Sequence, residues 1–253
     1  MAKVLEVKNV TKHYGGSVVT KALDNVTFDI YDSEFVAMMG PSGSGKSTLL
    51  NVIATIDEVS SGNIMLNGVS LCDRREDELS SFRREKLGFV FQEYNLLDTL
   101  TVAENITLPL DLMRVPPREA EDKLFKIAAT LDIKDQLDKF PYELSGGQRQ
   151  RAACARAVIT SPSLVLADEP TGALDSKNTR LLMNTFELMN ASLGSTILAV
   201  THDAGVGSYA NRVLFLKDGR IWCESVRGDR TRREFYDEIL VVSASLGGES
   251  DAR

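Results

Sequence analysis

The stretch Gly40-Pro41-Ser42-Gly43-Ser44-Gly45-Lys46-Ser47 fits the pattern G-x-x-x-x-G-K-[ST], which is typical of a phosphate-binding loop. Its glycines allow the backbone to turn so that successive N–H groups point at phosphate oxygens. Lys46 can reach the outer phosphates as a point charge, and the Ser47 hydroxyl can bind a Mg²⁺ ion that bridges them. The stretch therefore predicts nucleotide binding.

The segments on either side of this loop support the prediction. Residues 34–39 (EFVAMM) form an apolar run typical of a buried strand, and residues 47–54 (STLLNVIA) favour a helix. A helix that starts at the loop supplies a partial positive charge for an anion. The alternative, an ordinary Gly-Ser turn with a surface lysine, does not explain why strand, loop and helix follow in this order.

Composition limits the class of protein. The chain has 253 residues, of which 43% are hydrophobic and 26% charged, enough for one large domain or two small ones with a sizeable core. The formal net charge of −7 disfavours nucleic acid as a partner. The run 227–233 (RGDRTRR) is the main local basic candidate, and a solvated linker explains it better.

Cysteine usage and hydropathy bear on the cellular compartment. Cys72, Cys154 and Cys223 are widely spaced and lack the spacing of a metal site, which fits a reducing cytosol. Cys154 lies in an apolar helical stretch and is expected in the core. We expect no signal peptide and no membrane span, so any work at a membrane would go through another chain.

The pattern along the chain predicts alternating strands and helices around a helical insertion. From Thr101 to about Ser161 the sequence is helical, and a hairpin with a type I′ turn at Asp218-Gly219 is expected over 212–224. Alternating βα units favour a parallel sheet with helices on both faces. Strands are expected over residues 3–40, 63–68, 87–92, 164–168 and 195–202.

Polar side chains end three of the predicted strands, at Gln92, Asp168-Glu169 and His202. Ligand groups gather at the carboxyl ends of parallel strands. Asp168 suits a carboxylate aimed at Mg²⁺, and Glu169 can act beside the attacking water. Alone, each has a plainer alternative: a polar strand edge for Gln92, a solvated acidic turn for the acids and a structural role for His202.

Two further features bear on a nucleotide site. Tyr14 could stack on a base, although a half-buried tyrosine at a strand end is the alternative. Residues 144–148 (LSGGQ) open a second helix, which Ser145 can cap and whose paired glycines expose N–H groups. One nucleotide needs only one phosphate loop. The second helix terminus is therefore expected to serve a nucleotide held by another copy of the chain.

Taken together, the motifs resemble those of the ATP-binding-cassette ATPases, over about residues 3–225. The phosphate loop, Gln92, the pentapeptide 144–148, the acids Asp168 and Glu169, the triplet 173–175 and His202 appear in that family's order. The resemblance implies an α/β fold: a P-loop NTPase parallel-sheet core with an N-terminal antiparallel β subdomain and an inserted helical subdomain. It implies an ATPase domain over 1–225, with its core at about 1–92 and 162–225 and its helical subdomain at about 93–161. Residues 226–253 are expected to form a helical accessory tail.

The resemblance also implies roles for individual residues. Catalysis is expected to involve Glu169 on the attacking water, His202 on the γ-phosphate, Gln92 as a Mg²⁺ sensor that relays to a membrane partner, and Lys46. Mg²⁺ is expected on Ser47, Gln92 and Asp168. A head-to-tail dimer would sandwich two ATP molecules, with Asp175 bridging the subunits. The expected ATP-binding residues are Tyr14, Gly40, Pro41, Ser42, Gly43, Ser44, Gly45, Lys46, Ser47, Thr48, Ser145, Gly146, Gly147, Gln148 and Asp175.

The stretch 167–175 (ADEPTGALD) resembles the branch that drives lipoprotein release, macrolide export and cell-division signalling. Within it, residues 91–102, 208–210 and the tail look like the Firmicute ATPases for bacitracin and lantibiotic resistance. Ala204 stands where the branch often carries proline. The resemblance implies a membrane permease as partner, in some systems with a sensor kinase, and a place on the cytoplasmic face of the membrane.

Three alternatives to peptide resistance come from the same superfamily. The chain could serve a lipoprotein-release or macrolide-export system, or be a signalling ATPase of the cell-division type that transports nothing. A soluble nucleic-acid ATPase is disfavoured by the single cassette, the short span between motifs and the acidic charge. The transported molecule is not encoded in this chain.

Overall fold

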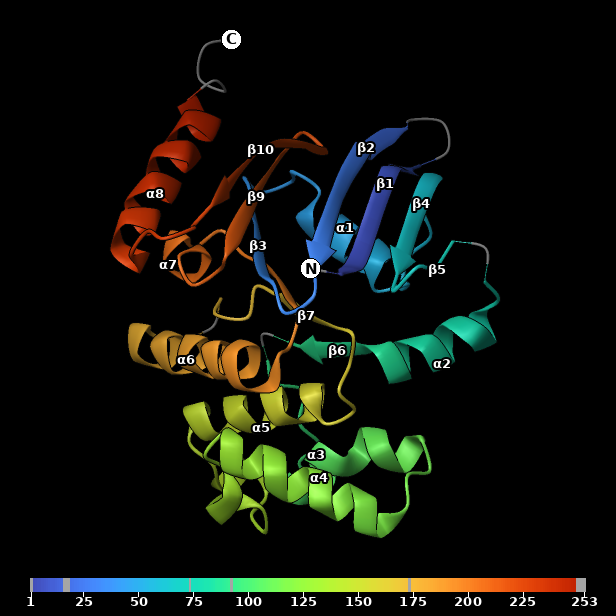
Figure 1. The fold of residues 1–253 in the computed structure, drawn as a ribbon, viewed down its shortest axis with the longest axis vertical. Coiled ribbons are helices and arrows are strands. Elements are labelled where there is room, and N and C mark those ends of the chain that lie inside the picture. Colours follow the sequence, from blue (N-terminus) through green and yellow to red (C-terminus); the bar gives the residue numbers. More distant parts are fainter. Residues whose placement is uncertain (1, 16–18, 73, 92, 173, 249–253) are drawn as a thin grey trace.

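The computed structural model, which describes residues 2–15, 19–72, 74–91, 93–172 and 174–248, contains two β-sheets and a layer of helices (Figure 1). The central sheet has the strand order β10-β9-β3-β8-β7-β6. All neighbouring pairs are parallel except β9 and β10, which form an antiparallel hairpin. Its strands are β3 (Phe35–Met39), β6 (Leu87–Val90), β7 (Leu164–Asp168), β8 (Ile197–Val200), β9 (Arg212–Lys217) and β10 (Arg220–Val226).

Both faces of the central sheet are covered, because its inner strands are apolar throughout. On β3, Val36 and Met38 pack with α1 (Lys46–Ile53) and the second sheet, whereas Phe35, Ala37 and Met39 pack with helices on the other face. Such continuous apolar strands are typical of parallel sheets. Polar side chains can therefore reach solvent mainly at the strand ends.

The second sheet is antiparallel, with the order β2-β1-β4-β5. Its burial pattern along the chain is mostly alternating, since one face packs on α1 and the other meets water. Figure 1 shows these blue and teal strands beside α1, away from the helical layer. The strands are β1 (Lys3–Tyr14), β2 (Thr20–Tyr31), β4 (Ser61–Leu66) and β5 (Val69–Ser70).

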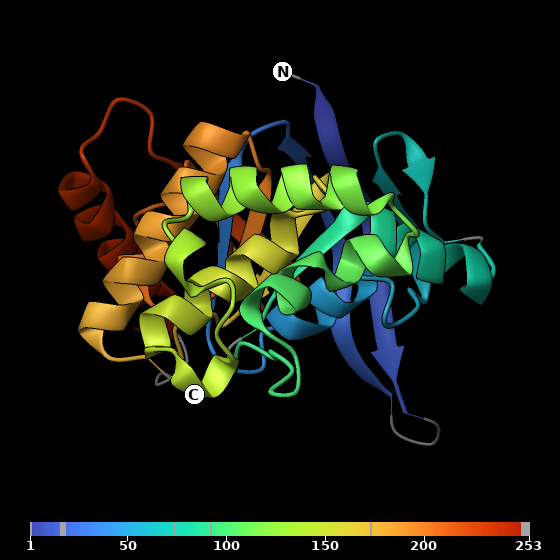
Figure 2. The ribbon, with the colours of Figure 1, turned by 90° about the horizontal axis from the view of Figure 1, so that it is seen from below.

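The helical layer lies below the central sheet in Figure 1 and faces the viewer in Figure 2. Each helix begins with a recognisable signal: Thr101 forms a capping box for α3, Pro117 opens α4, and Asp175 caps α6. The layer consists of α3 (Val102–Leu112), α4 (Pro117–Thr130), two short 3₁₀ turns η1 (Lys134–Gln136) and η2 (Pro141–Glu143), α5 (Gly146–Val158) and α6 (Ser176–Leu193).

The last helix, α8 (Arg232–Gly248), packs against the short α7 (Ala204–Gly207). It buries Phe235, Ile239 and Leu246 in the same core cluster as the helical layer. α2 (Glu76–Lys86) leads directly into β6. That residues 226–253 act as an accessory stays a prediction, as do the domain boundaries.

The predicted fold class is confirmed: a parallel-sheet core, an N-terminal antiparallel sheet and an inserted helical layer are all present. The hairpin prediction is also confirmed, because Asp218 and Gly219 both have positive φ, 49° and 74°, as a type I′ turn requires. Cys154 is fully buried, as expected. Within the described part of the chain, no helix has the length and apolar character needed to cross a bilayer.

Candidate functional site

The phosphate loop connects β3 to α1 and is packed so closely that two of its glycines are required. A Cβ on Gly40 would lie 2.1 Å from the Leu216 carbonyl oxygen, and a Cβ on Gly45 would lie 2.5 Å from that of Ala22. Gly45 also has φ 104°, a conformation that side chains disfavour. The loop is therefore held open by its neighbours before any ligand arrives.

Lys46 is buried and folded back across this loop. Its Nζ donates to the carbonyl oxygens of Gly40 and Pro41, each at 2.9 Å. Burial lowers the pKa of Lys46, while Glu169 and Asp168 act in the opposite direction. No side chain caps the N-terminus of α1, and the buried Ser44 Oγ has no hydrogen-bond partner. These unsatisfied donors beside a cation fit a phosphate group.

The β9–β10 hairpin braces the loop from the side. The Gly219 N–H donates to the Ser44 carbonyl at 3.0 Å, and the Asp24 N–H donates to the Gly219 carbonyl at 2.8 Å. The sequence predicts the turn at Asp218-Gly219 but gives no signal that it touches the loop, because the contact joins segments far apart in the chain.

The two acids lie next to the loop, at the carboxyl end of β7. Burial, and then the nearby Glu169 carboxylate, raises the pKa of Asp168, while hydrogen bonding from Ser47 opposes the shift. The Asp168 Oδ1 is buried without a hydrogen-bond partner. Among the described residues, no group of three or more His, Cys, Asp or Glu side chains is placed to hold a metal ion by itself, so a cation here would rely on Asp168, the Ser47 hydroxyl and ligand oxygens.

Glu169 and His202 face each other. The His202 Nδ1 lies 3.0 Å from the Glu169 carboxylate, and the histidine side chain is 73% exposed. Glu169 has φ 43°, and its N–H donates to the Val200 carbonyl at 2.9 Å, which fixes it between β7 and β8. The structure thus brings the two acids and His202 together with the phosphate loop.

A cleft of about 350 Å³ opens between these groups. It is lined by Ser47, Asp168 and Glu169 on one side and by Phe91, Glu93 and Asn95 on the other. Gln92 lies outside the described residues, and so does Ala173 of the predicted triplet. Phe91, Glu93 and Asn95 were not among the predicted site residues; they belong to the stretch 91–102, whose sequence indicates a subfamily and not a contact with the site, and only the folded chain places them there.

Tyr14 lies at the end of β1, close to α1. Its hydroxyl donates to Asp57 Oδ2 at 2.5 Å, and its side chain is also hydrogen-bonded to Thr48 of α1. The Lys12 ammonium lies 4.8 Å from the ring centroid. With 42% of its surface accessible, Tyr14 is an exposed residue. Both alternatives named from sequence, a base contact and a strand-end tyrosine, stay open.

The second helix terminus lies in the helical layer. Ser145 and Gln148 form a closed capping box: Ser145 Oγ accepts from the Gln148 N–H at 3.3 Å, and Gln148 Oε1 accepts from the Ser145 N–H at 2.9 Å. A Cβ on Gly147 would lie 3.2 Å from Leu181 of α6. Ser145 and Gln148 do not line the cleft that holds Ser47 and Glu169.

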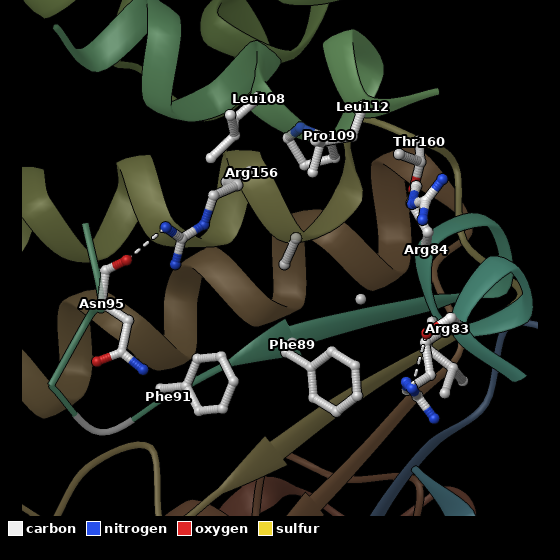
Figure 3. Close-up of a pocket in the computed structure, with 14 residues that line it drawn as sticks. Arg83, Arg84, Phe89, Phe91, Asn95, Leu108, Pro109, Leu112, Arg156 and Thr160 are labelled. Atoms are coloured by element: carbon white, nitrogen blue, oxygen red, sulfur yellow. Dashed lines mark hydrogen bonds between the residues drawn. The ribbon is translucent and has the colours of Figure 1, made fainter. Parts of the chain in front are cut away.

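A separate groove of about 440 Å³ lies on the other side of Phe91 and Asn95. Figure 3 shows Phe89 and Phe91 below Leu108, Pro109 and Leu112, with Arg156 reaching toward Asn95. The two phenylalanine rings stack with centroids 5.8 Å apart. Arg83, Arg84 and Arg156 make the groove basic as well as apolar.

A family model described as "ABC transporter" matches residues 23–172. "ABC transporter ATP-binding protein YxdL" of Bacillus subtilis is 53% identical, over 99% of this chain and 97% of its own. "Bacitracin export ATP-binding protein BceA" of Halalkalibacterium halodurans is 46% identical, over 97% of each chain.

A solved structure shows the same fold. It is a dimeric post-hydrolysis state of the ATP-binding cassette MJ0796 bound to ADP and phosphate. The two folds superpose with a TM-score of 0.76 at 40% identity, over 88% of this chain and 98% of the other.

Proposed function

This chain belongs to the ABC transporter family, and from that premise we propose that it powers a separate permease that protects cells against cell-wall-targeting peptides such as bacitracin or lantibiotics. It is an ATPase, which converts ATP and water to ADP and phosphate. What we propose beyond ATP hydrolysis is its use in peptide resistance and the residues that carry it out.

The fraction of the chain that matches the bacitracin export protein supports the peptide-resistance proposal. The match to the bacitracin export protein extends over 97% of both chains, whereas the match to the MJ0796 structure covers 88% of this one. The bacitracin relative thus matches more of the chain than the catalytic cassette alone. A lipoprotein-release or macrolide-export role, or a signalling role without transport, remains the alternative to test.

For the reaction itself, we assign ATP phosphates to the phosphate loop and to Lys46. The Glu169 carboxylate accepts the proton of the attacking water, and His202, oriented by Glu169 at 3.0 Å, donates to the γ-phosphate. Asp168, Ser47 and Gln92 would hold Mg²⁺; the buried, unpartnered Asp168 Oδ1 supports the assignment of Asp168. When bound, Mg²⁺ neutralises charge that develops on the phosphate oxygens. Tyr14 stacks on the adenine.

A second copy of the chain completes each site in this proposal. Ser145, Gly147 and Gln148 of the partner close over the nucleotide held by Lys46 and Ser47, and Asp175 bridges the two subunits. Ser145 and Gln148 do not line the cleft of their own chain, which supports this arrangement, as does the dimeric assembly of the MJ0796 cassette.

The groove at Phe89 and Phe91 is the surface that we assign to the permease. Its apolar floor and its arginines suit a short helix with apolar and acidic side chains (Figure 3). In this arrangement the chain sits on the cytoplasmic side of the membrane, held there by the permease. A sensor kinase would contact the permease rather than this chain.

Antibiotic susceptibility of a sensitive bacterium tests the proposed task. The chain is expressed together with the membrane protein encoded beside it, and the minimal inhibitory concentration of bacitracin and of a lantibiotic is measured. We expect an increase of about tenfold, and none with Glu169→Gln, which should retain ATP binding and form a stable dimer. Protection against erythromycin alone, or no protection while both proteins are present at the membrane, would contradict the peptide proposal.

A further inference from the structure

The segment that follows β6 separates two spaces on the surface of the molecule. Phe91 and Asn95 line both the cleft with Ser47, Asp168 and Glu169 and the groove with Phe89 and Leu108. Glu93, between them, lines the cleft. A shift of this segment therefore changes the wall of the catalytic cleft and the wall of the groove together.

This segment has an unfavourable backbone. Tyr94 and Asn95 both have positive φ, 60° and 49°, a region that a bulky residue such as tyrosine rarely adopts. Its local hydrogen bonds run from the Tyr94 N–H to the Phe91 carbonyl at 3.4 Å and from the Asn95 N–H to the Glu93 carbonyl at 2.6 Å. Two consecutive strained residues persist only when surrounding contacts hold them.

Arg156, on α5, makes those contacts from a position 62 residues further along the chain. One nitrogen of its guanidinium donates to the Tyr94 carbonyl at 2.8 Å, and the other donates to the Asn95 carbonyl at 2.5 Å. The two bonds use the planar fork of the side chain to hold adjacent peptide groups. Figure 3 shows the arginine extending from α5 across the end of the groove to Asn95.

A second residue of α5 holds the same segment by its side chain. The Arg149 guanidinium lies 5.4 Å from the centroid of the Tyr94 ring. The Tyr94 hydroxyl lies beside the first residue of α5, 3.5 Å from where a Cβ on Gly146 would stand. Both the main chain and the Tyr94 side chain of the segment are thus held by α5, the helix that Ser145 caps.

We propose that Arg156 is a positioning residue for ATP hydrolysis, which holds residues 93–95 in their strained conformation and so fixes the wall of the cleft opposite Ser47 and Glu169. It acts through Tyr94 and Asn95 and does not touch the nucleotide. Because it rises from α5, it also transmits any movement of that helix to the cleft. The inference rests on the ATPase activity and on the site assignments above, but not on the peptide substrate or the permease.

The position of Arg156 predicts a specific kinetic signature. Lys46 and Tyr14, which we assign to the phosphates and the base, do not line this cleft, whereas Ser47 and Glu169 face the segment across it. Loss of Arg156 should therefore slow hydrolysis without weakening ATP binding. A misplaced wall near the reacting groups can lower a rate by about tenfold to a hundredfold.

The test uses the purified full-length chain with Arg156→Met, Arg156→Lys and, as a matched control, Arg118→Met on the exposed face of α4. Three quantities are measured: kcat, the ATP dissociation constant by titration calorimetry, and hydrogen exchange of a peptide that contains residues 93–95. For Arg156→Met we expect kcat at least tenfold lower, an ATP dissociation constant within twofold of wild type, and faster exchange in that peptide. Arg156→Lys should restore part of kcat, since an ammonium can still donate to a carbonyl, and Arg118→Met should change nothing.

Two results would overturn the inference. One is an unchanged kcat in a folded Arg156→Met protein. The other is a parallel loss of kcat, ATP affinity and melting temperature that lysine does not restore, which would make Arg156 a residue of general stability only. Because these measurements need neither permease nor peptide, they stand apart from the susceptibility test. An inactive wild-type protein would instead count against the site assignments.

Discussion

The N-termini of α1 and α5 both have glycine-rich sequences, but within one chain they differ in how their backbone N–H groups are capped. At α1, no side chain caps the helix, Gly45 is left-handed, and Lys46 lies folded onto the loop carbonyls. At α5, Ser145 and Gln148 close the terminus with a capping box. The first terminus thus has no side-chain cap to displace, whereas at the second the Gln148 N–H is already bonded to Ser145 Oγ.

The difference suggests an order of events. A phosphate can bind at α1 without displacing any side-chain cap, whereas binding at α5 must replace hydrogen bonds worth about 1 kcal/mol in all. Binding at α5 is therefore weaker by about this free energy, which favours a nucleotide already held elsewhere and presented to it. Such an order fits the proposal that α5 serves the nucleotide of a second copy.

The largest effect is expected from Lys46→Ala, which removes the cation of the α1 terminus. Charge-assisted hydrogen bonds to the phosphates are lost, so the ATP dissociation constant of the isolated chain should rise about a hundredfold, or ~3 kcal/mol. Titration calorimetry measures it, with the exposed Lys126→Ala as control. Unchanged affinity in a folded Lys46→Ala protein would show that α1 is not the primary anion site.

The Ser145→Ala variant should distinguish the roles of the N-termini of α1 and α5. We expect the ATP dissociation constant to stay within twofold, because α1 is intact, while kcat falls about tenfold or more, since the partner's contact to phosphate is lost. Loss of the cap should also cost about 1 kcal/mol of stability. Ser145→Thr, which keeps the hydroxyl, serves as control for both readings. Equal losses of affinity and kcat would instead place both termini at one nucleotide within a single chain.

The smallest effect concerns Asp168, beside the N-terminus of α1. The pKa of Asp168 in the folded state is raised above its ordinary value of 3.8. The protonated carboxyl therefore stabilises the fold in full below pH 3.8, and this stabilisation is lost as the pH rises through the raised pKa. Without ligand, Asp168→Asn should therefore melt a few degrees above wild type at pH 7.5 and show little difference near pH 4. Thermal melting across this range measures it. A variant that melts below wild type at pH 7.5 would show that the carboxylate is not a strained group.

The motifs at both termini could be found from sequence because their structure is local. The phosphate loop, the Ser145 cap and the Asp218-Gly219 turn each arise within a few residues, where backbone conformation and short-range hydrogen bonds decide. The apolar strands that end in Asp168 and His202 were found by the same kind of pattern. Their convergence at one sheet edge followed from the rule for parallel sheets.

The sequence by itself therefore determined the fold class, the two helix termini and most of the proposed catalytic residues. Only the tertiary structure decided what joins them: the Gly219 bond to the phosphate loop, the cleft wall at Phe91 and Asn95, and the Arg156 contact across 62 residues. The physical reason is that such contacts depend on how distant segments pack. No periodicity or short motif records which carbonyl a partly buried guanidinium will reach.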